Sequence, residues 1–100
     1  MNTQEELDTL LIHTVFNQQR AIAEQLISKG ANVNYAFNGV TPLIAAVEGE
    51  NKEIIELLLR NGANPRLKTY IGTYGETDAI NYARRMVKNE YLASLLESYW

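Results

Sequence analysis

The sequence predicts an all-α fold, and three observations support this prediction. Residues 39–67 read as two short helices joined by a turn. Each of these helices has a capping signal at its start and an apolar stripe along one face. The same unit recurs on both sides at a similar spacing, so three helix pairs account for almost the whole chain.

The first helix of the central unit begins at Thr41 and Pro42. The threonine hydroxyl can accept a hydrogen bond from the free N–H groups of the first turn. Proline suits the first helical position because its missing N–H costs nothing there. We expect the helix to end at residues 48–50. Its apolar face consists of Leu43, Ala46 and Val47.

The second helix of the unit begins after Asn51, a good capping residue. It ends at Asn61 and Gly62, where glycine can adopt the left-handed conformation. Two short antiparallel helices cannot bury their own apolar faces, so this unit needs neighbours. The apolar stripe of this helix consists of Ile54, Ile55, Leu58 and Leu59.

The central unit has matches upstream and downstream. Upstream, the turn 30–32 reads Gly-Ala-Asn and repeats the turn 62–64, which lies 32 residues later. Downstream, we match the leucine pair 95–96 to the pair 58–59, at a spacing of 37 residues. The same shift places Asp78 on Thr41, as the cap of a fifth helix.

These repeated residues resemble the ankyrin repeat, whose period is about 33 residues. The resemblance implies a solenoid of three helix–turn–helix repeats joined by extended fingers, in a single domain 1–100 with repeats at about 5–34, 39–67 and 75–100. Histidine usually follows Thr-Pro-Leu in this family, and Ile12, Ile44 and Asn81 stand there instead. The resemblance rests on Gly39-x-Thr41-Pro42-Leu43, Ala46, Leu58-Leu59 and Gly62-Ala63-Asn64.

The flanking units predict four more helices, at about 3–16, 19–29, 79–86 and 89–99. Gln4, Glu5 and Asp8 should face solvent, as suits an end repeat. The finger from Lys68 to Thr77 is about four residues longer than the period requires. The inner faces should consist of Leu7, Leu10, Leu11, Thr14 and Val15, then Ile22, Ala23, Leu26 and Ile27, and finally Tyr91, Leu92, Leu95 and Leu96.

Composition argues against most chemistry. The chain has no cysteine, a single histidine, His13, and a formal net charge of −3. An isolated histidine is a poor metal site, and catalytic sites need grouped residues. We therefore expect no enzyme activity, no cofactor, no metal and no nucleic-acid partner. A polar start and the lack of a long apolar run predict a cytoplasmic protein without a membrane contact.

The family resemblance implies a module that binds another protein. In this family the finger tips and the exposed side of the first helices form a concave binding face. Tyrosine and phenylalanine are enriched at such surfaces. The alternative is that some of these rings fold over the fingers as local core. The candidate contact residues are Phe16, Tyr35, Phe37, Asn38, Val40, Glu48, Tyr70, Tyr74 and Arg85.

Two questions about function stay open at this level. The chain could act as a scaffold or adaptor, or as a stoichiometric inhibitor such as an immunity protein that neutralises a toxin. We expect a monomer rather than a homodimer. Tyr99 and Trp100 should seal the end of the core, since terminal repeats need a cover; a dimer contact there is the alternative.

Overall fold

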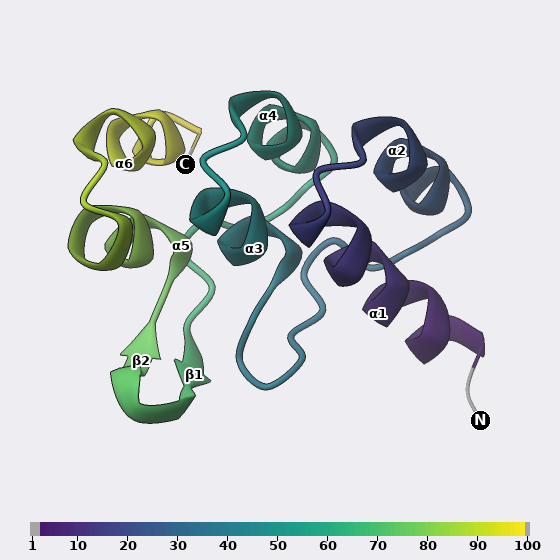
Figure 1. The fold of residues 1–100 in the computed structure, drawn as a ribbon, viewed down its shortest axis with the longest axis horizontal. Helices are drawn as coiled ribbons and strands as arrows, with labels where there is room; N and C mark the ends of the chain where they lie inside the picture. Colours follow the sequence, from purple (N-terminus) through teal and green to yellow (C-terminus); the bar gives the residue numbers. More distant parts are fainter. Residues whose placement is uncertain (1–2, 100) are drawn as a thin grey trace.

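Three helix pairs stand side by side in chain order in this computed structural model, which describes residues 3–99 (Figure 1). Helices α1, α3 and α5 form one layer, and α2, α4 and α6 form the other. This arrangement confirms the predicted all-α stack. The bounds are α1 Thr3–Phe16, α2 Arg20–Ser28, α3 Pro42–Glu48, α4 Lys52–Arg60, α5 Ala79–Asn81 continued by a π-helical segment Tyr82–Val87, and α6 Glu90–Glu97.

Side-chain caps start four of these helices, as the sequence predicts for the central pair and for Asp78. Thr41 Oγ1 accepts a hydrogen bond from the Ile44 N–H at 3.1 Å, and Asn51 Oδ1 accepts one from the Ile54 N–H at 3.1 Å. Each cap satisfies one of the donors that a helix leaves free in its first turn. Asp78 and Asn89 cap α5 and α6 in the same way, at 2.8 and 3.0 Å.

Polar contacts join the turns of neighbouring pairs. The Asn34 side chain donates to the Gly62 carbonyl at 3.1 Å and accepts from the Asn64 N–H at 2.8 Å. Asp8, which we expected to face solvent, is buried, because its carboxylate accepts a hydrogen bond from the Asn32 N–H at 2.7 Å. Both contacts satisfy backbone groups that would otherwise be left without partners.

Three residues expected inside lie on the surface. Leu10 is 50% exposed and Ile22 is 43% exposed. Helix periodicity identifies an apolar stripe, but it does not say whether a neighbour covers that stripe. Tyr91 is also exposed, and the Lys52 Nζ lies 5.5 Å from the centroid of its ring. The side chains of the core that are completely buried include Leu11, Leu43, Ile54, Ile55, Leu58 and Leu96.

The predicted alignment of the last helix is wrong by one residue. Gln18, Glu50 and Lys88 each have a positive φ in the turn between the two helices of a pair, at 57°, 52° and 61°. Their spacings are therefore 32 and 38 residues, so the leucine pair 95–96 corresponds to 57–58 and not to 58–59. The first helices keep the spacing of 37, from Thr41 to Asp78.

The π-helical segment takes up the extra residue. In the central pair the Asn51 N–H donates to the carbonyl of Ala46, five residues earlier, at 3.2 Å. In the last pair the Asn89 N–H donates to the carbonyl of Ala83, six residues earlier, at 2.9 Å. A wider helical turn thus brings α6 back into the position that α4 occupies in the central pair.

Both fingers end in tight turns. In the first, Asn38 and Gly39 adopt positive φ values of 52° and 82° between the bridged residues Phe37 and Val40. An Asn-Gly pair is a strong signal for this kind of turn. The second finger is a hairpin: β1 (Thr69–Ile71) pairs antiparallel with β2 (Gly75–Thr77) across a 3₁₀ turn.

The two fingers touch at Gly39. A Cβ atom at this position would lie 1.7 Å from the Tyr70 carbonyl oxygen, so only glycine fits there. Thr69 Oγ1 also donates a hydrogen bond to the Gly39 carbonyl, at 2.5 Å. The first finger is therefore held against the base of the hairpin. No helix in the described part of the chain is long and apolar enough to cross a membrane.

Candidate functional site

A row of equivalent positions runs along the ends of the first helices. Phe16, Glu48 and Arg85 follow one another at spacings of 32 and 37 residues, which are the spacings of these helices. All three side chains are exposed. Stacking of the repeats thus turns three residues that are distant in sequence into one line on the surface.

The fingers add large exposed rings beside this row. Phe37 is 48% exposed, Tyr70 is 70% exposed and Tyr74 is 59% exposed. Both fingers extend from the layer of first helices on the side away from the second helices (Figure 1). We call the surface formed by these fingers and the exposed ends of the first helices the concave face.

Three other candidates have a local role in the structure. Tyr35 and Val40 are partly buried and pack against the core, so the expected alternative, in which a ring folds over the finger, describes Tyr35. Asn38 is exposed and forms the tip of the first finger. These residues shape the finger that presents Phe37.

Tyr82 connects the central pair to the hairpin, and the sequence analysis missed it. Its hydroxyl donates a hydrogen bond to Glu48 Oε1 at 2.6 Å. Its ring meets that of Tyr74 edge to face, with centroids 6.5 Å apart. Burial and the Glu48 carboxylate raise the pKa of Tyr82 to about 12. The sequence did contain a signal for Tyr82: a large tyrosine stands at the position where the central pair has the small Ala45, 37 residues earlier.

A small pocket of about 100 Å³ lies between the hairpin and the π-helical segment. Arg85 and Glu76, which belong to opposite walls, form no ion pair with any described residue. The pocket thus offers one free cation and one free anion beside two aromatic rings, a combination suited to a protein side chain. Its walls are Tyr74, Glu76, Thr77, Asn81, Tyr82, Arg85 and Met86.

Tyr99 is 38% exposed, so it does not close the core, and Trp100 lies outside the described residues. Within residues 3–99, no group of three or more His, Cys, Asp or Glu side chains could hold a metal ion. Most of the exposed aromatic residues of the described structure lie on the concave face, namely Phe16, Phe37, Tyr70 and Tyr74.

Comparison with known proteins gives consistent matches. Residues 1–69 match the family model described as ankyrin repeats (3 copies). Over 61 residues the chain is 46% identical to the 2-5A-dependent ribonuclease of Homo sapiens, a match that covers 59% of this chain and 8% of that protein. Over 70 residues it is 37% identical to the ankyrin repeat and KH domain-containing protein mask-1 of Caenorhabditis elegans, a match that covers 68% of this chain and 3% of that protein.

The chain thus spans less than a tenth of the length of either relative. Ankyrin repeats generally act as non-enzymatic modules that mediate contacts between proteins. The family model covers more than half of the sequence, over the first two helix pairs, and the third pair stacks on them in the same way (Figure 1). The chain therefore belongs to the ankyrin repeat family.

Proposed function

We propose that this chain binds another protein through its concave face and has no catalytic activity of its own. The observation that supports this proposal is the set of three large exposed rings on two touching fingers, Phe37, Tyr70 and Tyr74. Aromatic residues bring a large contact area at a small entropic cost, which explains their enrichment at interfaces.

The centre of the contact should lie at Phe37 and Tyr74. Each stands four residues before the cap of a first helix, Thr41 or Asp78, so the two are equivalent in the repeat. Binding energy concentrates in a few central residues that lose their water on contact. Tyr74 also forms a wall of the pocket, which can receive a side chain of the partner.

Site-specific photocrosslinking tests the binding face directly. A photoreactive benzoylphenylalanine replaces Phe37 or Tyr74 in one set of variants, and Glu24 on the exposed side of α2 in a control. We expect one cytoplasmic protein of the native host to be captured from positions 37 and 74 and not from position 24. Capture from position 24 alone would mean that the partner binds the second helices.

The captured partner then allows a quantitative test. Phe37→Ala and Tyr74→Ala should each weaken binding by about 1–4 kcal/mol, as expected of aromatic residues at the centre of an interface. Glu24→Ala should leave the affinity unchanged. Lys52→Ala would be a poor control, because Lys52 contacts the Tyr91 ring and so connects α4 to α6.

The same partner distinguishes an adaptor from an inhibitor. An inhibitor, such as an immunity protein acting on a toxin, abolishes the partner's activity at an equal molar amount, and Phe37→Ala restores that activity. An adaptor binds with the same face and leaves the activity intact.

A further inference from the structure

The first pair exposes residues that the other pairs bury. Leu10 corresponds to Pro42 and Ala79, and Ile22 corresponds to Ile54 and Leu92. The four counterparts are almost completely buried, while Leu10 and Ile22 are exposed. At the counterparts, the preceding helix pair supplies the cover, because each repeat buries its face against its neighbour. The exposed end of α1 and α2, which we call the leading face, therefore has stacking residues without a cover.

A wide apolar groove marks this face. It has a volume of about 390 Å³ and is lined by Leu7, Leu10, Thr3, Glu6 and Lys29. Glu6 and Lys29 lie at the groove and form no ion pair within the described chain. The leading face thus combines an apolar centre with one free negative and one free positive charge. His13 and Gln25 are exposed polar residues at positions where the central pair has the buried Ala45 and Leu57.

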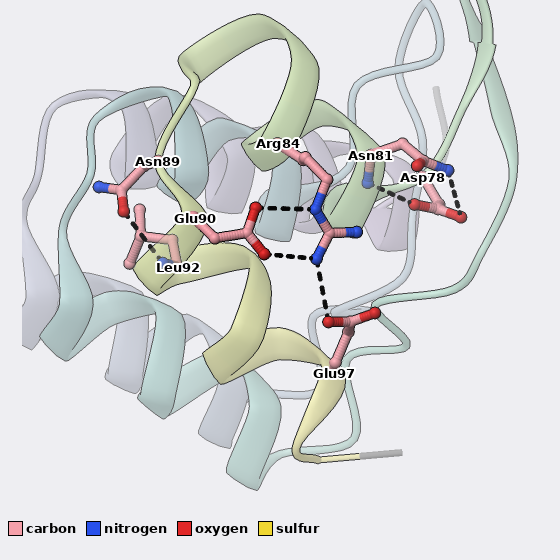
Figure 2. A network of polar contacts seen from close by, with 7 residues as sticks. All are labelled: Asp78, Asn81, Arg84, Asn89, Glu90, Leu92 and Glu97. Atoms are coloured by element: carbon pink, nitrogen blue, oxygen red, sulfur yellow. Dashed lines mark hydrogen bonds and ion pairs between the residues drawn. The ribbon is translucent and has the colours of Figure 1, made fainter.

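The opposite end of the stack carries a network of charged side chains. There Asn81, Arg84 and Glu97 replace the buried apolar residues Ile44, Val47 and Leu59 of the central pair. Figure 2 shows Arg84 between two carboxylates, with hydrogen bonds of 2.9 Å to both oxygens of Glu90 and of 3.0 Å to Glu97. Covering this network with an apolar face would remove water from three charged groups, which is unfavourable.

The first pair also supplies hydrogen-bond partners to the backbone groups of its own turn. In the central pair, the Gly62 carbonyl and the Asn64 N–H are bound by Asn34 from the preceding finger. In the first pair, Gln4 donates to the Gly30 carbonyl at 3.0 Å, and Asp8 accepts from the Asn32 N–H at 2.7 Å. The long α1 therefore occupies the place of a preceding finger, which disfavours an ordinary ankyrin repeat as the cover.

We propose that the leading face binds a second copy of this chain, head to head about a two-fold axis. A head-to-tail contact would place the apolar groove on the charged network, whereas a head-to-head contact places apolar residues on apolar residues and closes the assembly at two copies. In this arrangement we place Glu6 of each chain opposite Lys29 of the other, which makes the two charges complementary across the contact. The proposed dimer differs from the monomer that we expected from the sequence. The reason is that Leu10 and Ile22, which we expected in the core, are exposed on the leading face.

Sedimentation velocity on the 100-residue chain tests the proposal. We expect the dimer fraction to rise through a concentration series reaching about 1 mM, the range of weak complexes. Leu10→Glu and Ile22→Glu should each weaken the dimer at least about tenfold, because they would bury an unpaired charge. Phe37→Glu, which adds the same charge to a similarly exposed ring on the concave face, should leave it unchanged.

A charge exchange tests the orientation. Glu6→Lys and Lys29→Glu should each weaken self-association, because each places like charges together twice. An equimolar mixture of the two variants should form dimers again, since both contacts then join opposite charges. A monomer at every wild-type concentration, a dimer that survives Leu10→Glu and Ile22→Glu, or a mixture that stays monomeric would each overturn the proposal.

Discussion

The Tyr82 hydroxyl forms one of the two side-chain hydrogen bonds that join the central helix pair to the last one within the described residues; the other runs from Asn89 to Glu50. Tyr82 is buried beside the hairpin, and its hydroxyl donates a hydrogen bond to Glu48, across the boundary between two repeats. The hydroxyl must keep its proton to donate this bond to a carboxylate. Burial, and after it this hydrogen bond, raise the pKa of the hydroxyl from about 10 in an exposed tyrosine to about 12 in the folded chain.

This pKa shift predicts a loss of stability at alkaline pH. The folded state holds the Tyr82 proton more tightly than the unfolded state, so the contribution is fully present below pH ~10 and is lost as the pH rises through about 12. The loss should be about 1–2 kcal/mol, since one pKa unit corresponds to about 1.4 kcal/mol and nearby solvent weakens the effect. Urea titrations from neutral to strongly alkaline pH measure it.

Tyr82→Phe provides the matched control. The variant lacks the hydroxyl, so it should be less stable than the wild type at neutral pH, and this difference should shrink above pH ~10. When the tyrosines are titrated by absorbance, the variant should lack the ionisation near pH ~12 that the wild type shows. A difference between the two proteins that is independent of pH would contradict the assignment.

At the scale of the elements, the π-helical segment is the irregular part of the stack. π-helical turns are rare and occur frequently at functional sites. Here the segment contributes three pocket residues, Tyr82, Arg85 and Met86. The turn at the same place in the central pair closes over five residues, between Ala46 and Asn51, so the fold does not require the wider turn of six.

Deletion of Met86 tests this separation of fold and site. Without Met86, the hydrogen bond from the Asn89 N–H to the Ala83 carbonyl would close a turn of five residues instead of six. This is the length of the turn in the central pair. We expect an unchanged helical circular dichroism spectrum and a melting temperature that is not lowered. Affinity for the crosslinked partner should fall, because the pocket loses a wall. An unfolded variant would show that the wide turn is needed for folding.

At the scale of the whole molecule, the three pairs form one cooperative unit. No pair can bury its apolar faces alone, and Leu58 of α4 is completely buried in the middle of the stack. Contacts between the turns, such as those of Asn34, add a polar connection between pairs. Loss of one pair should therefore expose the faces of its neighbours.

Leu58→Ala tests this cooperativity. The change should lower the free energy of unfolding by about 2–5 kcal/mol, the usual range for removing a large buried side chain. Urea unfolding followed by far-ultraviolet and near-ultraviolet circular dichroism should give one coincident transition for both proteins. Two separated transitions would mean that the pairs unfold independently. Glu24→Ala on the surface of α2 should change the stability little.

Local patterns in the sequence were enough to predict the helices, the caps of the central pair and the family. Caps such as Thr41 and Asn51 and the apolar stripes act within a few residues, so local chemistry is enough to identify them. The sequence also identified the exposed rings of Phe37 and Tyr74, because neither helix capping nor the apolar stripes require them. Whether those rings bind a partner remains a prediction.

Which apolar residues are covered, and how the last pair is aligned, became clear only from the packing of the repeats. Leu10 and Ile22 have the pattern of core residues, and their exposure depends on the absence of a neighbour at the leading face of the described stack. The bond between Tyr82 and Glu48 joins residues 34 positions apart, and the pocket forms where the hairpin packs against the π-helical segment. Such contacts depend on how the repeats stack, and no local pattern in the sequence records that geometry.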